Sequence, residues 1–396
     1  MKKTVAALLA AALLLTAPAL PAAAANGPTE AAAQDAGAII GENSAKACAL
    51  MDVNTGTLIA AMNGREQLYP ASVTKVMTLL LVCEAIEEGK LTLQTPLTCS
   101  ETAAAKGGSQ IWLEPGEEMT VDDLLKATAV GSANDACTLL GEAVAGSEAA
   151  FVERMNERAE ALGMTDTHFD NCSGLDDDTQ THKTTACDIA LMSRALLGHE
   201  LIRNYTTVWM DDLRGGATQL VNTNKLIRSY PGATGLKTGT TGKAGCCVAA
   251  SAQRDGMELI AVVLGAANSK ERFAAARALL DWGFANYEIY TPENDASLLG
   301  EVTVRHGLRR SFTPVCEEGT DILVRKGIAA QITRTAECPQ EIEAPVAAGQ
   351  AVGRIVFRAG EETVAENAVV CPEEIPAIDW LHAWGLFFRV FSRRVE

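Results

Sequence analysis

A serine and a lysine three residues apart are the first side chains in this sequence suited to catalysis. Ser72 begins the segment Ser-Val-Thr-Lys and Lys75 ends it, directly after a Tyr-Pro-Ala tripeptide. The apolar run that follows predicts a helix over about 73–88, with both side chains on one face of its first turn. A serine hydroxyl is a poor nucleophile until a base takes its proton, and a lysine with a lowered pKa is such a base. The segment therefore predicts a serine nucleophile paired with a lysine.

Two further short motifs place polar side chains later in the chain. The tripeptide Ser132–Asn134 follows a predicted helix of about 121–130, and the segment Lys237–Thr240 opens an apolar stretch that predicts strands. A lysine with neighbouring hydroxyls at a strand edge is suited to hold a carboxylate, and Gly239 has no side chain to block a substrate. Each motif alone is common in turns, so the functional prediction depends on all three occurring together.

In this order the three motifs resemble the signature S-x-x-K, S-D-N and K-T-G of penicillin-recognising serine enzymes. The alanine between Ser132 and Asn134 departs from S-D-N and is similar to the low-molecular-mass penicillin-binding proteins, the serine-type D-alanyl-D-alanine carboxypeptidases. The resemblance also includes the segments 222–226 and 231–239, and it covers most of the chain. It implies a β-lactamase/transpeptidase-like α+β domain, then a small all-β domain and a C-terminal amphipathic helix.

The resemblance implies a catalytic role for three residues and a substrate-binding role for a fourth. Ser72 would be the acylated nucleophile and Lys75 its general base. Ser132 would pass a proton to the leaving amine. Asn134 would orient Lys75 and bind the substrate amide.

The third motif would bind the other end of the substrate. The resemblance assigns the terminal carboxylate to Lys237, Thr238 and Thr240, with Gly239 completing the substrate-binding segment. Backbone N–H groups of Ser72 and Thr240 would form the oxyanion hole. His182 is similar to a residue that borders the family's site, and a structural histidine with both nitrogens hydrogen-bonded is an equal alternative.

The implied reaction is removal of the terminal D-Ala from peptidoglycan stem pentapeptides, without a metal or other cofactor and with β-lactams as covalent inhibitors. A class A β-lactamase is one alternative, but Asp170 and Asn171 supply no glutamate at the spacing that its deacylation needs. A silent wall-binding or β-lactam-sensing protein would be favoured if Ser72 or Lys75 were missing, and both are present. A zinc D,D-peptidase is a third alternative, and the His and Cys residues show no ligand spacing for it.

Composition limits the remaining classes of protein. The 396 residues are 48% hydrophobic, which supports a large core, and their number fits two domains. The net charge of −17 argues against a nucleic-acid partner, because phosphate binding needs basic surface. The 11 cysteines are odd in number and scattered, which favours buried free thiols and leaves one or two disulfides open.

Both ends of the chain differ from its middle. Residues 1–25 combine Lys2 and Lys3 with an apolar run and an Ala-rich end, which is typical of a cleaved bacterial signal peptide. The Ala- and Gly-rich residues 26–45 predict a linker. In residues 375–396 four aromatics form one helical stripe, which predicts an amphipathic membrane-anchor helix. The alternative is a helix packed on its own domain. We therefore expect an exported protein at the outer face of the bacterial cytoplasmic membrane.

The pattern between these ends predicts two domains. A β-hairpin at 47–62, strands over 235–264 and three more helices at about 148–162, 185–197 and 270–287 fit an α+β domain of residues 46–290. Its sheet would join the two ends of the domain's own sequence. Short alternating segments then predict a small β-domain of residues 297–371.

Overall fold

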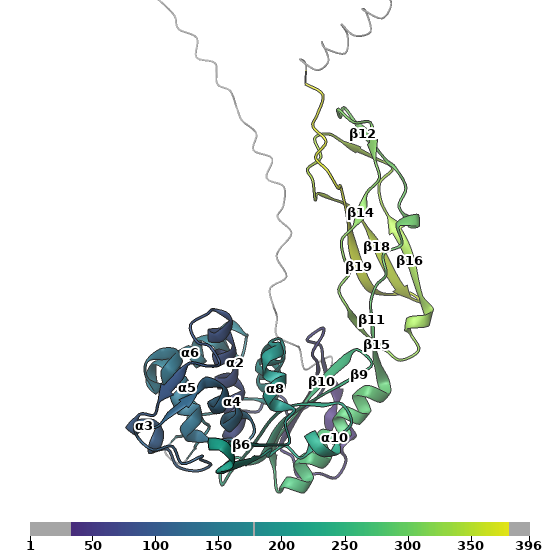
Figure 1. Ribbon diagram of the computed structural model, residues 1–396. Helices are drawn as coiled ribbons and strands as arrows, with labels where there is room; N and C mark the ends of the chain where they lie inside the picture. Colours follow the sequence, from purple (N-terminus) through teal and green to yellow (C-terminus); the bar gives the residue numbers. More distant parts are fainter. Residues whose placement is uncertain (1–32, 177–178, 380–396) are drawn as a thin grey trace, which may run out of the picture.

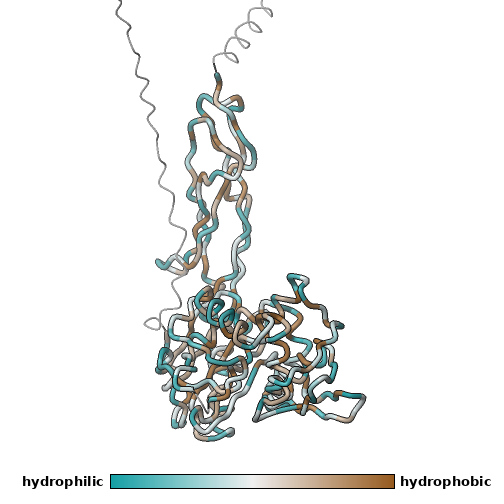
Figure 2. Tube along the Cα trace, turned by 90° about the vertical axis from the view of Figure 1, so that its left-hand side faces the viewer, coloured by the Kyte–Doolittle hydropathy of each residue, from teal (hydrophilic) through white to brown (hydrophobic). Residues whose placement is uncertain are grey.

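The computed structural model describes residues 33–176 and 179–379, so the predicted signal peptide lies outside the described residues. A larger part with helices and a sheet is formed by the first two-thirds of the chain (Figure 1). A narrow β-domain stands away from it, as the view turned by 90° also shows (Figure 2). The predicted α+β domain followed by an all-β domain is confirmed.

The larger part is built on a six-stranded sheet with the order β1-β3-β2-β10-β9-β8. Strand β2 pairs antiparallel with β10, so the predicted joining of the two ends of the domain's sequence is observed. Strand β8, which carries the Lys237–Thr240 motif, is at the edge of the sheet and has β9 as its neighbour. The strand bounds are β1 Gln34–Asp35, β2 Ala47–Asp52, β3 Leu58–Met62, β8 Ala233–Thr241, β9 Gly245–Arg254 and β10 Met257–Ala266.

Both faces of this sheet are covered, because successive side chains of each strand point to opposite sides. In β2, Ala49 and Met51 enter one hydrophobic core, and Cys48 and Leu50 enter the other. The first core is closed by the helices α2 Lys75–Glu87, α4 Val121–Ala129, α5 Asn134–Ala145, α6 Glu148–Ala161 and α7 Ala186–Leu197. The second is closed by α1 Ala36–Ile40 and α10 Ser269–Asn286.

Side-chain caps fix where several of these helices begin. The hydroxyls of Thr120 and Thr185 accept hydrogen bonds from backbone N–H groups in the first turns of α4 and α7, and Asn268 does the same for α10. The shorter elements are α3 Glu101–Ala104, α8 Arg203–Thr206, α9 Leu226–Ser229, the pair β4 Pro96–Thr98 and β5 Glu118–Thr120, and the hairpin β6 Met210–Leu213 with β7 Thr218–Val221. Short 3-10 turns are η2 Ala71–Thr74, η3 Glu200–Ile202 and η4 Arg214–Gly216.

Part of the predicted linker 26–45 belongs to the folded domain. Residues 34–35 pair with β3, and residues 36–40 form α1, whose N-cap Asp35 accepts a hydrogen bond from the Gly37 N–H. Ala36 is fully buried in the core beneath α10. Small residues indicated a linker, but they also allow this short helix to pack closely.

The β-domain contains a three-stranded sheet, β13-β12-β17, and a four-stranded sheet, β14-β19-β18-β16. Its first strand begins earlier than predicted, because β11 pairs with β15 and lies inside the range expected for the larger domain. The bounds are β11 Tyr287–Tyr290, β12 Val302–Arg305, β13 Ser311–Phe312, β14 Val315–Cys316, β15 Ile322–Arg325, β16 Ile332–Glu337, β17 Glu341–Glu343, β18 Ala351–Ala359 and β19 Glu362–Val370, with 3-10 turns η5 Ala296–Leu298 and η6 Ala329–Gln331.

The first residues of the predicted C-terminal helix are extended. Ile375 pairs with Val346 and Ala377 with Gly307, and the Ile375 side chain is buried in the small core of the β-domain. Its burial with Val346 fixes the backbone there, so a helix beginning at residue 375 is wrong. The remainder, from residue 380, lies outside the described residues. Within the described ranges, no helix has the length and apolar character that crossing a membrane requires.

All 11 cysteines are free thiols, and nine of them are buried, as the scattered pattern favoured. Burial raises the pKa of Cys48 and of Cys83 to about 12. These two thiols are therefore protonated at neutral pH and pack as small apolar side chains.

Candidate active site

Ser72 lies in the 3-10 turn η2, which continues directly into α2. The residue before it, Ala71, has a φ of +49°, in the left-handed region that non-glycine residues rarely adopt. Two glycines bring other segments against this turn. A Cβ on Gly239 would lie 2.8 Å from the Ser72 backbone nitrogen, and one on Gly174 would overlap the carbonyl oxygen of Ala71. The edge strand β8 and the loop around Gly174 therefore both close onto the serine.

Lys75 is completely buried at the start of α2. Its Nζ lies 3.0 Å from Ser72 Oγ, 2.6 Å from Asn134 Oδ1 and 2.7 Å from the carbonyl oxygen of Ser173. Burial lowers the pKa of the Lys75 ammonium, because water no longer stabilises its charge. An amine with a lowered pKa, held in hydrogen-bonding contact with a serine hydroxyl, is suited to accept that proton.

A second lysine lies on the other side of the site. Lys237 Nζ donates hydrogen bonds to Ser132 Oγ at 2.8 Å and to the carbonyl oxygen of Thr238 at 3.1 Å. Burial, and then the like charge of Lys75, hold the pKa of Lys237 well below its usual range. Ser132 itself has a φ of +62°, a second strained position that directs a motif residue into the site.

Asn134 is the first residue of α5, so a tight turn after α4 and a helix start together position the second motif. Besides accepting from Lys75, its side chain donates to the carbonyl oxygen of Gly107 at 2.7 Å. The loop that contains Gly107 is tied to the same helix end, because Asp135 accepts hydrogen bonds from the backbone N–H groups of Ile111 and Leu113. The amide orientation of Asn134 is thereby fixed by two partners.

The second half of β8 holds the hydroxyls of the third motif. Thr238 is buried and donates a hydrogen bond of 2.7 Å to Thr223 Oγ1, and Thr240 is exposed. Behind them lies Arg272 of α10, only 7% exposed, whose Nη1 donates to Gly239 O and Thr240 Oγ1 at 3.0 Å each. Its Nε has no hydrogen-bond partner in the described chain. A third cation is thus held beside the hydroxyl of Thr240.

His182 is fully buried beside the site and both of its ring nitrogens are used. Nδ1 accepts from the backbone N–H of Asp170 at 2.9 Å, which leaves the proton on Nε2 to be donated to Thr74 Oγ1 at 2.8 Å. Burial lowers the pKa of His182 to about 4. A neutral, structural histidine fits this geometry. This was one of the two interpretations of His182 that the sequence left open.

The three motifs, far apart in the sequence, therefore meet in one site with two buried lysines and two serine hydroxyls. Matches to known protein families identify the class of protein that has these motifs. The D-alanyl-D-alanine carboxypeptidase family matches residues 29–268, and the C-terminal domain of penicillin-binding protein 5 matches residues 287–377. The chain belongs to the D-alanyl-D-alanine carboxypeptidase family. The predicted resemblance is confirmed.

Curated relatives and solved structures agree with this assignment. The carboxypeptidase is 39% identical over 335 residues to DacF of Bacillus subtilis, with 84% of this chain and 86% of the relative covered. It is 34% identical to DacC of Escherichia coli, with 88% and 87% covered. Penicillin-binding protein 5 of Haemophilus influenzae has a TM-score of 0.76 at 28% identity, with 85% and 98% covered. The carboxypeptidase is therefore a serine peptidase of the penicillin-binding class.

Several contributors to the carboxypeptidase's site were missed from the sequence. Arg272 lies in a helix predicted for its apolar pattern, and only the packing of α10 behind β8 brings it to Thr240. Ser173 contributes a backbone carbonyl oxygen, and the type of a residue does not indicate that its backbone belongs to a site. Thr223 lies within a segment that carried the resemblance, and that was the one available signal. Among residues 33–176 and 179–379 the structure has no group of three or more His, Cys, Asp or Glu placed to hold a metal ion.

Proposed function

We propose that Ser72 is the residue acylated when the carboxypeptidase removes the terminal D-Ala of a peptidoglycan stem pentapeptide. One observation carries the assignment: the buried Lys75 Nζ lies 3.0 Å from Ser72 Oγ and has a lowered pKa. As Ser72 Oγ attacks the scissile carbonyl carbon, Lys75 takes its proton. The negative charge on the carbonyl oxygen is stabilised by the backbone N–H groups of Ser72 and Thr240.

Release of D-Ala needs a proton on its nitrogen. Ser132 Oγ, which accepts a hydrogen bond from Lys237 at 2.8 Å, relays to the leaving amine the proton that Lys75 took from Ser72, and Lys75 returns to its neutral form. The carboxylate of the leaving D-Ala is held by Lys237, Thr238 and Thr240, with the cation of Arg272 behind them. Water then attacks the ester carbonyl of the acyl-enzyme, and Ser72 is restored as the tetrapeptide leaves.

Asn134 and Gly239 complete the substrate-binding set. Asn134 holds Lys75 through Oδ1 and, in the proposal, binds the substrate amide beside the scissile bond. Gly239 allows the substrate backbone to lie against β8 close to Ser72. No cofactor takes part in these steps, since Lys75, Ser132 and water carry every proton.

β-Lactams would acylate the same serine and leave slowly. The segment 170–182 contains no glutamate. A class A β-lactamase uses such a glutamate to activate the deacylating water. Penicillin-binding protein D2 of Listeria monocytogenes, 33% identical over 61% of this chain with a TM-score of 0.56, has been solved in an ampicillin-bound form. A long-lived penicilloyl adduct on Ser72 therefore fits this chain better than rapid β-lactam hydrolysis.

The test combines product analysis with mass spectrometry. A pentapeptide ending in D-Ala-D-Ala should lose one D-Ala, and incubation with penicillin should add its mass to the peptide that contains Ser72. Ser72→Ala should abolish both, while Ser132→Ala should retain folding and lose most turnover. Adduct formation elsewhere, D-Ala release by Ser72→Ala, or sustained cephalosporin hydrolysis without an adduct would contradict the proposal. Chelator treatment should not change the rate, and loss of activity with a chelator would favour the zinc alternative.

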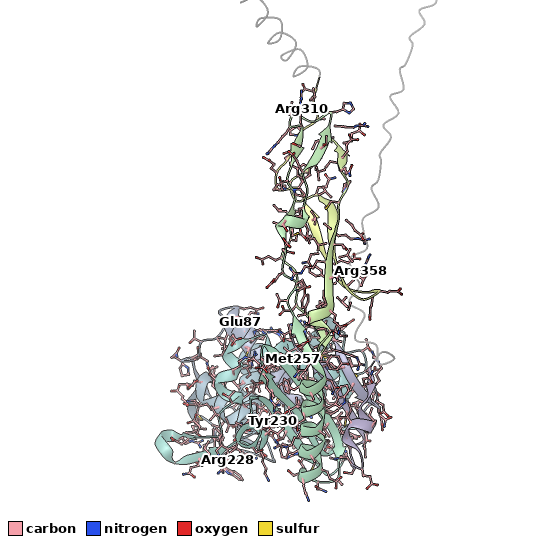
Figure 3. All side chains as sticks on the ribbon, turned by 90° about the vertical axis from the view of Figure 1, so that its right-hand side faces the viewer. Glu87, Arg228, Tyr230, Met257, Arg310 and Arg358 are labelled. Carbon is pink, nitrogen blue, oxygen red and sulfur yellow. The ribbon has the colours of Figure 1, made fainter. Side chains whose placement is uncertain are left out.

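We further propose that the protein is exported and acts at the outer face of the cytoplasmic membrane. Residues 1–25 supply the signal-peptide pattern, and residues from 380 supply the aromatic stripe. Support comes from where the described chain ends. Residue 377 pairs with Gly307 at the end of the β-domain farthest from the larger domain, the end at which Figure 3 labels Arg310. A membrane contact there leaves the larger domain free to reach the cell wall.

Truncation after Asp379 tests the anchor without removing Ile375, which fills the core of the β-domain. The truncated protein should leave the membrane fraction and hydrolyse soluble peptides at the rate of the full chain. Membrane partition that does not change on truncation would contradict the anchor.

A further inference from the structure

Two buried thiols face each other beside the proposed site. Cys137 lies on α5 and Cys172 lies in the loop before Gly174, and both side chains are completely buried. The two thiols are within hydrogen-bonding reach of each other. Cys137 Sγ also donates to the backbone carbonyl oxygen of Cys172 at 3.2 Å, and Cys172 Sγ lies 3.5 Å from Thr138 Oγ1. The fold thus brings together the sulfur atoms of residues that are 35 positions apart in the sequence.

Each thiol is next to a residue that holds Lys75. Cys137 follows Asn134 by three positions, so both side chains lie on one side of the first turn of α5. Asn134 Oδ1 lies 2.6 Å from Lys75 Nζ. Cys172 directly precedes Ser173, whose carbonyl oxygen lies 2.7 Å from the same nitrogen. A covalent bond between the two sulfur atoms would therefore join the two segments that fix the position of the base.

The surroundings of the pair tolerate the loss of both thiol hydrogens. The carbonyl oxygen of Cys172 accepts a hydrogen bond from Cys137 Sγ, but it also accepts one from Thr78 Oγ1 at 2.7 Å. Glu148 accepts from Cys172 Sγ at 3.4 Å, but it also forms an ion pair with Lys106. Each of these acceptors keeps another donor when the thiols are oxidised, so neither is left buried and unpaired.

We propose that Cys137 and Cys172 form a disulfide in the exported enzyme, which locks α5 to the loop of Ser173 and so holds both partners of Lys75 in place. The described form, in which these thiols are free, is then the reduced enzyme. The proposal rests on the proposed function for its compartment, because disulfides persist outside the cytoplasm, where no thiol pool reduces them. The choice of these two cysteines rests only on the contacts within the fold.

The oxidant is itself a disulfide, of a small molecule or of a thiol oxidoreductase, and the bond forms in two exchange steps. The thiolate of Cys137 attacks one sulfur of the oxidant, so that a mixed disulfide forms and one thiolate of the oxidant leaves. The thiolate of Cys172 then attacks the Cys137 sulfur, and the second thiolate of the oxidant leaves. The two cysteines lose two electrons and two protons, and the oxidant becomes two thiols. Because both sulfur atoms are buried in the folded chain, the exchange takes place during folding, before the loop of Cys172 closes over α5.

The first experiment identifies the bond. The full chain is isolated from the outer face of the membrane and alkylated in denaturant before any reduction. All but two of the 11 cysteines should react. A tryptic digest should contain one pair of peptides linked through Cys137 and Cys172, which separates on reduction. Cys83→Ala, which removes another buried thiol, is the matched control and should keep the linked pair.

The second experiment measures what the bond does. The wild-type enzyme is compared before and after reduction in urea and refolding with its thiols kept reduced. Since the bond closes a loop between residues 35 positions apart, reduction should lower the midpoint of thermal unfolding by about 5–10 °C. The double variant Cys137→Ala/Cys172→Ala should show no such shift on reduction. Penicillin acylation should stay within about twofold in both forms of the wild type, because the reduced enzyme already holds Lys75 at both contacts.

The outcomes separate the disulfide from the proposed export. Free thiols at both positions in protein recovered outside the membrane, or a bond from either cysteine to a different one, would overturn the pairing. Equal unfolding midpoints of the oxidised and reduced enzyme would overturn the lock. Protein retained in the cytoplasm with residues 1–25 attached would contradict the export. The pairing is then decided by refolding the purified chain with oxidised glutathione, where the linked peptides support it and their absence overturns it.

Discussion

Replacing Gly239 by alanine tests how closely β8 must approach the nucleophile. A Cβ at this position would lie 2.7 Å from the carbonyl oxygen of Pro70, 2.8 Å from the Ser72 nitrogen and 2.9 Å from Ala71 Cβ. All three contacts are to backbone or to a short side chain, so no flexible group can move away. Gly242, three residues further on, has no atom within 4 Å of such a Cβ and provides the matched control.

The size of the effect follows from these distances. Ordinary van der Waals contact begins at about 3.4 Å, so β8 must move away from Pro70 by about 0.7 Å from the present 2.7 Å. This movement widens the gap between Ser72 and Thr240, whose N–H groups are proposed to stabilise the oxyanion. A displacement near 1 Å costs about 100-fold in rate, so we expect kcat/KM of Gly239→Ala to fall by about 10- to 100-fold. That loss corresponds to about 1.4–2.7 kcal/mol of transition-state stabilisation.

The assay measures D-Ala release from a pentapeptide and, separately, the rate of acylation by penicillin. Both should fall together in Gly239→Ala, because the peptide and the β-lactam use the same oxyanion position. Gly242→Ala should stay within twofold of the wild type. Thermal unfolding of both variants controls for loss of the fold. Activity of Gly239→Ala equal to that of Gly242→Ala, with both proteins folded, would refute the argument that β8 must touch the serine turn.

Three further outcomes are expected. Asn134→Ala removes the 2.6 Å acceptor of Lys75, and penicillin acylation should slow by about 10- to 100-fold, as for loss of one hydrogen bond to a charged group; a change under twofold would contradict the role. Arg272→Met removes the cation behind Thr240, and KM for a peptide with a free terminal carboxylate should rise about tenfold; an unchanged KM would count against it. Folding lowers the pKa of His182 from 6.5 to about 4. Between these pKa values the unfolded chain binds a proton that the folded chain does not, so the free energy of unfolding should fall by about 2 kcal/mol from pH 7 to pH 5. Urea unfolding of His182→Gln should show a smaller loss over the same interval, and an equal loss would show that other groups cause it.

Local sequence was sufficient wherever a pattern alone fixes an element. The apolar runs predicted α2, α4, α6, α7 and α10 to within a few residues, because Thr120, Thr185 and Asn268 mark helix starts with hydroxyl or amide caps. The short alternating segments likewise predicted strands such as Ile322–Arg325. Local patterns were insufficient at residues 34–40 and at β11, where pairing with a distant strand decides the structure.

The sequence by itself determined the chemistry of this protein, because Ser72, Lys75 and the two later motifs carry their reactive groups whatever surrounds them. It did not determine where the charges would be buried. The pKa of Lys75 is lowered only because the folded chain buries its ammonium between Ser173 and Asn134, and these residues come from a loop and a helix about 60 or more positions away. The cation of Arg272 reaches Thr240 only because α10 packs behind β8. Lys183 reaches the ring of Tyr69 only because distant segments of the chain pack against each other. Burial and proximity depend on the packing of distant segments, so only the tertiary structure decided them.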